Sequence, residues 1–219
     1  MNHRTDSATA ELFPGEPIEA IAPGALWLRG FVADNANPLL GAIESIAAAA
    51  PFRNMVTPGG FTMSVAMTNC GKAGWITDRR GYRYTENDPL SGKPWPAMPR
   101  LFTEFAARAA AAAGFADFAP DACLVNRYEP GTRMSLHQDK DERDFTQPIV
   151  SISLGLPATF LFGGLSRSDR PRRLRLESGD VLVWGGPARR AFHGVDPLAQ
   201  GADPLTGAYR YNLTLRKAL

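Results

Sequence analysis

Cysteine and histidine are scarce in this sequence, which has two cysteines and three histidines among its 219 residues. Cys70 and Cys123 belong to no C-x-x-C motif, so neither a disulfide framework nor a thiolate zinc site is predicted. This usage is typical of a reducing compartment, and we expect a cytoplasmic location. Net charge is also small, because 24 Lys and Arg residues offset 22 Asp and Glu residues and leave +2. Total charge therefore neither predicts nor excludes a polyanionic partner.

Long hydrophobic runs are missing as well. No stretch approaches the roughly 18 uninterrupted apolar residues of a membrane-spanning helix, so no membrane partner is expected. Residues 1–23 are polar, contain three prolines and show no apolar period, and we interpret them as an N-terminal arm without chemistry of its own. Residues 24–219 are predicted to form one domain, since a 219-residue chain that is 44% hydrophobic fits a single core. Nothing indicates an obligate dimer, and we expect a monomer.

Hydrophobic periodicity predicts two helices, followed by a series of short strands. Apolar residues recur at helical spacing over 37–50, with Pro38 in the first turn, and again over 99–114, with Gly114 as the stop. Beyond Gly114, β-branched and aromatic runs such as ACLVNRY, ATFLFGG and DVLVWGG alternate with Gly, Pro and Asp. Such regular short strands indicate an antiparallel sandwich or barrel. The predicted fold class is mainly β with flanking helices (α+β), built on a jelly-roll core with both helices outside it.

Residues 51–99 have a different character, being rich in Gly, Pro and aromatic residues. Six basic and three acidic residues give this segment a charge of 6 − 3, or +3. We expect only one clear strand there, FTMSVAMT, and surface positions for Trp75, Tyr82, Tyr84 and Trp95. A long segment of this kind inside a compact domain is typical of a lid or a binding surface.

The motif LHQD places His137 two residues before Asp139, and the run AFHGV adds His193. With His3 set aside in the arm, a three-histidine zinc site is not available, whereas two histidines and a carboxylate suit non-heme Fe(II). Residues two apart on a strand point to the same side, so His137 and Asp139 can reach one ion. Simpler interpretations stay open: His-x-Asp is a common surface pair, and an isolated histidine on an apolar strand is usually a satisfied buried side chain.

The C-terminal run RYNLTLR carries polar and apolar residues on opposite strand faces, and the polar face holds Arg210, Asn212, Thr214 and Arg216. Two inward arginines are costly unless they pair with anions, and a guanidinium pairs bidentately with a carboxylate. A dicarboxylate such as 2-oxoglutarate would fit both, and on the same logic Asn126 and Tyr128 could donate to it. The alternative is that the polar face is exposed to solvent, as is common in antiparallel sheets.

A series of motifs extends from about Trp27 to Arg216: PFRNMVTPGGFTMSVAMTNCG, GKPWPAMP, NRYEPG, LHQDKDE, IVSISLGLPATFLFGG, DVLVWGG, FHG and RYNLTLR. In this combination the sequence resembles the bacterial AlkB family of Fe(II)- and 2-oxoglutarate-dependent nucleic-acid demethylases. The resemblance implies a double-stranded β-helix core, with residues 51–99 as an N-terminal nucleotide-recognition lid. Met134 and Arg83 depart from the family pattern.

The resemblance also implies roles for individual residues. The iron ligands would be His137, Asp139 and His193. The residues in contact with 2-oxoglutarate would be Asn126, Tyr128, Arg210, Asn212 and Arg216, with Arg210 on the distal carboxylate. The residues around the substrate nucleotide would be Trp75, Tyr82, Tyr84, Asp141 and Arg167.

The activity implied is oxidative demethylation of 1-methyladenine and 3-methylcytosine, in single- or double-stranded DNA and also in RNA, with Fe(II) as cofactor and 2-oxoglutarate and O2 as co-substrates. Such bases are cationic, and Asp141 and Trp75 offer a carboxylate and an aromatic face. They also pair poorly, which makes them cheap to extrude from a duplex. The alternative for Trp75 is an ordinary core tryptophan.

Two other functions remain open from the sequence: a hydroxylase on the same iron scaffold that acts on a small molecule or a protein, and a non-catalytic nucleic-acid binding module. The run RSDRPRRLR bears on this choice, because it holds the five arginines Arg167, Arg170, Arg172, Arg173 and Arg175. They would form a track for a phosphate backbone. The alternative is that these arginines lie on a strand face exposed to solvent, as is usual for such a run of charges.

Overall fold

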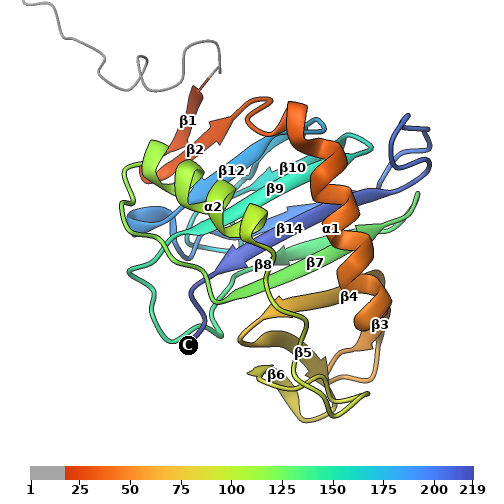
Figure 1. Cartoon of the computed structure of the whole chain (residues 1–219). Coiled ribbons are helices and arrows are strands. Elements are labelled where there is room, and N and C mark those ends of the chain that lie inside the picture. The colour runs from red at the N-terminus through yellow and green to blue at the C-terminus, as the bar shows by residue number, and fades with distance from the viewer. Residues whose placement is uncertain (1–17) are drawn as a thin grey trace, which may run out of the picture.

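Three β-sheets and two α-helices make up residues 18–219, the part of the chain that this computed structural model describes (Figure 1). The α-helices are α1 (Ala36–Ala49) and α2 (Arg100–Ala112), and two 3-10 turns cover Ala33–Asn35 and Gly186–Ala188. The strands are β1 (Ile18–Ala22), β2 (Ala25–Leu28), β3 (Arg53–Val56), β4 (Thr62–Gly71), β5 (Gly74–Asp78), β6 (Gly81–Thr85), β7 (Ala122–Tyr128), β8 (Met134–His137), β9 (Ile149–Gly155), β10 (Ala158–Phe162), β11 (Arg172–Leu176), β12 (Val181–Trp184), β13 (His193–Val195) and β14 (Arg210–Arg216).

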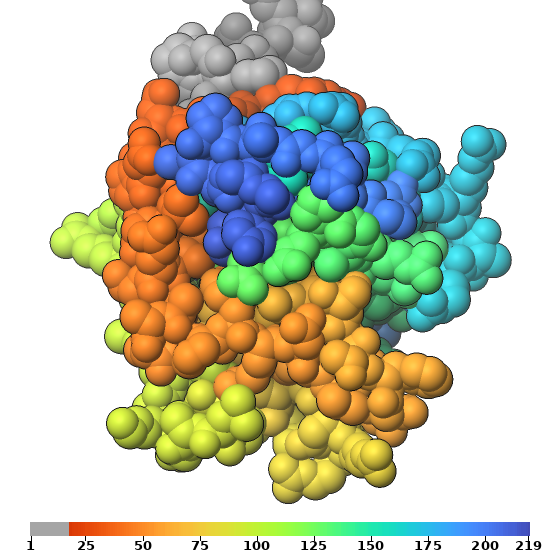
Figure 2. Space-filling model, turned by 90° about the vertical axis from the view of Figure 1, so that its right-hand side faces the viewer, coloured from red at the N-terminus to blue at the C-terminus, as the bar shows by residue number. Residues whose placement is uncertain are grey.

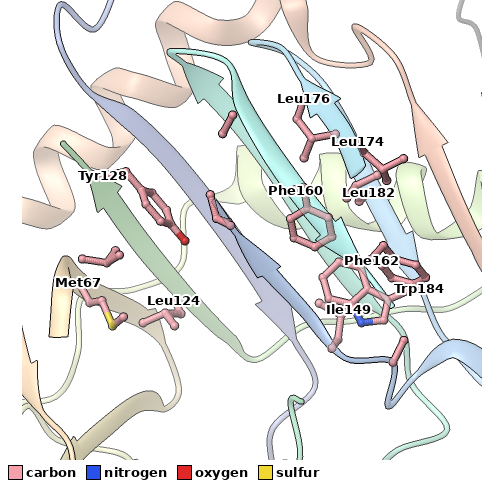
Figure 3. Packing of buried hydrophobic residues seen from close by; sticks show 14 of the residues in the cluster. Met67, Leu124, Tyr128, Ile149, Phe160, Phe162, Leu174, Leu176, Leu182 and Trp184 are labelled. Atoms are coloured by element: carbon pink, nitrogen blue, oxygen red, sulfur yellow. The ribbon is translucent and has the colours of Figure 1, made fainter. Parts of the chain in front are cut away.

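The two larger sheets pair their strands antiparallel and form the predicted jelly roll. The eight-stranded sheet has the order β1-β2-β12-β9-β14-β7-β4-β3, and the four-stranded sheet has the order β11-β10-β13-β8. Phe160 and Phe162 of the smaller sheet pack against Trp184 of the larger one, with ring centroids 6.2 Å apart in both pairs (Figure 3). Met67 and Leu124 belong to the same core cluster. The prediction of the fold class is confirmed.

Both helices lie across the outer face of the eight-stranded sheet, as predicted from their periodicity (Figure 1). Phe102 of α2 and Ile43 of α1 are buried in one cluster with Leu213 and Leu215 of β14. The helices thus cover the apolar face of β14, and its polar face turns toward the space between the sheets. Arg210 is only 1% exposed, so the interpretation of this face as solvent-exposed is wrong.

The segment 51–99 is more regular than predicted. It holds the four strands β3 to β6 instead of one: β3 and β4 extend the large sheet, and β5 and β6 form a separate two-stranded sheet. The segment, coloured orange to yellow-green, forms the lower part of the face in Figure 2. Trp95 is buried, and its indole N–H donates to the carbonyl of Thr85, so its predicted surface position is wrong. Short strands rich in glycine and polar residues have a weak strand signal in sequence, because their stability comes from pairing and packing more than from intrinsic preference.

The boundary of the predicted arm also needs correction. Ile18–Ala22 forms strand β1, which pairs antiparallel with β2 at the edge of the large sheet. Arg172 of β11 reaches this edge, donating to the carbonyl of Ile21 and to the carboxylate of Glu19. The rest of the predicted arm, residues 1–17, lies outside the described residues. Neither helix in 18–219 is long and apolar enough to cross a membrane.

Candidate metal and co-substrate site

His137, Asp139 and His193 converge at one point between the two sheets. One ligand atom from each lies within 4.8 Å of the others. His137 ends β8 and His193 begins β13, and these two residues are direct partners in the antiparallel register, so the two imidazoles lie side by side. Asp139 follows β8, with its carboxylate oxygens 3.8 Å from the Nε2 atom of each histidine.

Backbone carbonyls set the orientation of both imidazole rings. The Nδ1 of His137 lies 2.9 Å from the carbonyl of Ser135, and the Nδ1 of His193 lies 3.0 Å from that of Ala191. In both residues Nε2 is therefore the nitrogen directed toward Asp139, an arrangement typical of metal-ligating histidines.

The protonation states also suit a metal. Burial, together with the neighbouring His137 ring, lowers the pKa of His193 to about 4, so this imidazole is neutral at pH 7. Burial would raise the pKa of Asp139, but Arg216 and the two histidines outweigh it and hold this pKa well below its usual range. Two imidazoles and one carboxylate form the donor set that fits non-heme Fe(II).

A cavity of about 680 Å³ opens beside these three residues. The residues predicted to contact 2-oxoglutarate all contribute to its wall: Asn126, Tyr128, Arg210, Asn212 and Arg216. They come from β7 and β14, which are neighbours in the large sheet, and the register pairs Asn212 with Asn126 and Arg210 with Tyr128. Cross-strand pairing thus places the predicted donors on one patch of the cavity wall.

Arg210 is a buried cation that forms no ion pair within residues 18–219. Its guanidinium donates to the carbonyl of Leu156 at 3.2 Å and to the hydroxyl of Ser153 at 2.7 Å, and its Nε has no partner. Burial lowers the pKa of Arg210 to about 10 and raises that of Tyr128 to about 12, so at pH 7 both groups are protonated donors. A buried charge without a counter-ion is unfavourable, and this corner of the cavity is suited to an anion.

Arg216 has a different environment, although it shares a strand face with Arg210. Its Nη2 donates to Asp139 Oδ2 at 2.6 Å, and its Nε lies 3.3 Å from a carboxylate oxygen of Glu142. Sequence reasoning missed Glu142, which is only 6% exposed and ends the motif LHQDKDE. The sequence did contain a signal for Glu142, because this acidic residue lies three positions after the candidate ligand Asp139.

Four of the five predicted substrate residues line the mouth of the cavity: Trp75, Tyr82, Asp141 and Arg167. The indole N–H of Trp75 donates to Asp141 at 2.8 Å, and the Trp75 and Tyr82 rings stack at 5.7 Å. Tyr84 is absent from the cavity wall and instead donates its hydroxyl to Glu142 at 2.8 Å. The hairpin β5–β6 therefore presents Trp75 and Tyr82 to the cavity, and Tyr84, the cross-strand partner of Trp75, to Glu142 beside the cavity.

The predicted arginine track is mostly neutralised by acidic residues. Arg172, Arg173 and Arg175 lie on β11 at the edge of the smaller sheet and form ion pairs with Glu19, Asp196 and Glu177. These three form the solvated strand face that was the alternative interpretation, and the phosphate track stays a prediction for them. Arg167 differs, because it lines the cavity and donates to the carbonyl of Leu136.

Comparison with known proteins agrees with this geometry. The family model of the 2OG-Fe(II) oxygenase superfamily matches residues 24–216. Alpha-ketoglutarate-dependent dioxygenase AlkB from Escherichia coli and that from Salmonella typhimurium are each 59% identical over 200 residues, covering 91% of this chain and 93% of the relative. The tRNA demethylase abh1 of Schizosaccharomyces pombe is 34% identical over 148 residues, which is 67% of this chain and 47% of that protein. The solved structure of OsALKBH1 superposes with a TM-score of 0.80 at 30% identity, covering 92% of this chain and all of that one.

Proposed function

This chain belongs to the AlkB family of alpha-ketoglutarate-dependent dioxygenases within the 2OG-Fe(II) oxygenase superfamily, and we propose that it removes N-methyl groups from 1-methyladenine and 3-methylcytosine in DNA, and also in RNA. It is an Fe(II)-dependent enzyme with 2-oxoglutarate and O2 as co-substrates. One observation carries the proposal: the His-Asp-His cluster lies beside a cavity whose wall holds a buried arginine, Arg210, that has no ion-pair partner among residues 18–219.

His137, Asp139 and His193 would hold the iron, leaving its other positions open to the co-substrates. When bound, Fe(II) supplies an oxidant from O2 as 2-oxoglutarate is converted to succinate and CO2. Arg210 holds the distal carboxylate of 2-oxoglutarate, assisted by the Tyr128 hydroxyl, because a buried guanidinium gains most from a carboxylate partner. The cavity side chains Asn126, Asn212 and Arg216 then act as further donors around the co-substrate.

The mouth of the cavity suits a cationic base. Asp141 supplies a carboxylate held in place by the Trp75 indole, and the stacked Trp75 and Tyr82 rings supply an aromatic face. Stacking of a base on an aromatic side chain contributes about 1–3 kcal/mol. Arg167 lies at the same opening and is placed to meet a phosphate, and Tyr84 fastens the hairpin to the loop after β8 through Glu142.

The reaction is a direct reversal of alkylation damage. Hydroxylation of the N-methyl carbon gives a hemiaminal, which releases formaldehyde, and the ring nitrogen is left as in the undamaged base without strand cleavage. The chain's own contribution is to anchor the co-substrate and to place the methyl group close to the metal. The relative named as a tRNA demethylase supports RNA as a further substrate.

We assign residues 24–219, extended by strand β1, to a single catalytic domain in which 51–99 forms the nucleotide-recognition lid. We also propose that the enzyme acts as a monomer in the cytoplasm. Both cysteines are free and buried, in keeping with a reducing compartment. Light scattering of the purified full chain and fractionation of cells test these two points.

Mass spectrometry of a methylated oligonucleotide tests the function. The protein is reconstituted with Fe(II) without oxygen, then exposed to air with an oligonucleotide that carries 1-methyladenine or 3-methylcytosine, with and without 2-oxoglutarate. We expect loss of one methyl group and release of formaldehyde only when 2-oxoglutarate is present. Asp139→Ala should abolish this turnover, because it removes the anionic ligand.

The competing functions predict other outcomes. A hydroxylase of a small molecule or protein would leave the methylated base intact, even with active iron and 2-oxoglutarate. A nucleic-acid binding module would bind the oligonucleotide equally well with and without metal and 2-oxoglutarate. Either result, with full-length protein that binds the metal, would refute the demethylase proposal.

A further inference from the structure

Glu142 is a buried carboxylate that lies outside the cavity but close to Asp139. It is 6% exposed and receives the Tyr84 hydroxyl at 2.8 Å. Two guanidiniums approach the same carboxylate: Arg216 Nε at 3.3 Å, and Arg189 Nη2 at 3.1 Å in an ion pair without the geometry of a hydrogen bond. Burying a carboxylate is costly, so the three partners together determine where Glu142 can lie.

The same two arginines also contact Asp139 from opposite ends. Arg216 binds the carboxylate of Asp139 through Nε at 3.0 Å and Nη2 at 2.6 Å. Arg189, which is 3% exposed, donates to the backbone carbonyl of Asp139 at 3.2 Å. Asp139 and Glu142 therefore share two buried guanidiniums, and the formal charges of the four groups sum to zero.

We propose that Glu142 is a positioning residue for Asp139, acting through Arg216 and Arg189. The inference rests on the proposed role of Asp139 as a metal ligand. The Glu142 carboxylate gives Arg216 a second anion, in an ion pair at 3.3 Å beside the two hydrogen bonds that Arg216 donates to Asp139, so Asp139 keeps charge for the metal. Without it, Asp139 is the one ion-pair partner left to Arg216 among the described residues, and this guanidinium competes with the metal for the Asp139 oxygens, while Arg189 keeps its contact with the Asp139 backbone carbonyl.

Tyr84 links this arrangement to the substrate side. It belongs to β6, in the hairpin that also carries Trp75 and Tyr82, and its hydroxyl donates to Glu142. The hairpin therefore makes contact with the loop after β8 at two acidic residues, Trp75 with Asp141 and Tyr84 with Glu142. Removing the Tyr84 hydroxyl should disturb Glu142 slightly and leave every charge in place.

Titration with Co(II), a spectroscopic probe of the metal site, tests the inference in the full chain without oxygen. We expect Glu142→Gln to bind Co(II) about 10- to 100-fold more weakly than the unaltered protein and to change its visible absorption band, because partners behind a metal ligand typically have effects of this size. Tyr84→Phe should weaken binding in the same direction by a smaller factor. The matched control is Glu177→Gln, since Glu177 pairs with Arg175 on the far edge strand.

A residue that only anchors the loop would behave differently. Glu142→Gln would then lower the unfolding temperature while leaving both the Co(II) affinity and the absorption band unchanged, and this result would overturn the inference. If Glu142→Gln does not fold, Tyr84→Phe decides the matter, and an unchanged affinity and band in that variant overturn it. Failure of the unaltered protein to bind Co(II) would instead refute the metal site. Normal Co(II) binding without demethylation would refute only the proposed substrate.

Discussion

Arg210 and Arg216 illustrate how two identical side chains on one strand face acquire different roles. Arg216 lies against the carboxylates of Asp139 and Glu142, so its charge is balanced within the protein. Arg210 has only a carbonyl and a hydroxyl as acceptors, so its charge is not balanced by an ion pair within the described residues. The unbalanced arginine is the one suited to an anionic ligand.

Arg210→Met should weaken 2-oxoglutarate binding by roughly 30- to 150-fold, the loss of a charge-assisted contact of about 2–3 kcal/mol. Calorimetric titration of the Co(II)-loaded protein without oxygen measures this. The stability of the unliganded protein should not fall in proportion, because the substitution also removes an unpaired buried charge. Arg173→Met, at the edge strand, is the control, and equal affinities in the two variants would contradict the assignment of Arg210.

The pKa of His193 predicts how the stability of the metal-free protein depends on pH. Its folded-state pKa is about 4, against an ordinary value of 6.5, so between these values the unfolded chain binds the extra proton. The contribution of neutral His193 to the free energy of unfolding is therefore fully present above pH 6.5. It is lost as the pH falls toward 4, and the loss is at most about 3 kcal/mol. Urea unfolding at several pH values checks this, and His193→Gln should flatten the dependence across that window.

At the scale of elements, the hairpin β5–β6 is joined to the rest of the described structure by side-chain contacts and not by strand pairing with a larger sheet. It forms a two-stranded sheet of its own, and such hairpins are marginally stable without further contacts. Trp75 and Tyr84 tie it to the loop after β8, and Arg83 donates to both oxygens of Asp78 within the hairpin. Trp75 and Tyr82, the rings proposed to contact the substrate base, belong to this hairpin, so its rigidity should bear on recognition.

Asp78→Ala should loosen the hairpin without affecting global stability, because the ion pair lies at the surface and within one element. Hydrogen exchange followed by mass spectrometry should show faster exchange in peptides from β5 and β6 and unchanged exchange in β9. The midpoint of urea unfolding should stay the same. Uniformly faster exchange along the chain would contradict a local role for this pair.

The elements also show which helices and strands can be predicted from sequence patterns alone. α1 and α2 were predicted closely, because the apolar period of a helix is visible within the helix itself. β3, β5 and β6 were missed, because each is short and bounded by glycine or proline and depends on a partner strand. β1 was assigned to the arm for the same reason, since only its pairing with β2 marks it as a strand.

For the whole molecule, the distribution of charge around the cavity matters more than the net charge of +2. Arg133, Lys140 and Arg167 are exposed residues that line the cavity. The arginines of β11 are paired with acidic residues at the far edge of the smaller sheet. A nucleic-acid backbone that delivers a base to the cavity should therefore meet the first group and not the second.

The salt dependence of oligonucleotide binding distinguishes the cations that line the cavity from the arginines of β11. For a fluorescent single-stranded oligonucleotide, Arg167→Ala should reduce the slope of log K against log salt by about 0.7 if it removes one phosphate contact. Anisotropy titrations over a range of salt concentrations measure this. Arg175→Ala, whose side chain is paired with Glu177, should leave the slope unchanged. Equal effects of the two substitutions would indicate a diffuse attraction in place of the proposed contact.

By itself the sequence determined the helices, most of the strands of the core, the two faces of β14 and the three candidate metal ligands. These features depend on the spacing of residues within one element, and that spacing is readable without knowledge of the rest of the chain. Tertiary structure alone decided that the charge of Arg216 is balanced by carboxylates and that of Arg210 is not, that Tyr84 contacts Glu142 instead of lining the cavity, and that Trp95 is buried. The partners concerned are distant in sequence, 77 residues apart for Arg216 and Asp139 and 58 for Tyr84 and Glu142, and folding is what brings them together.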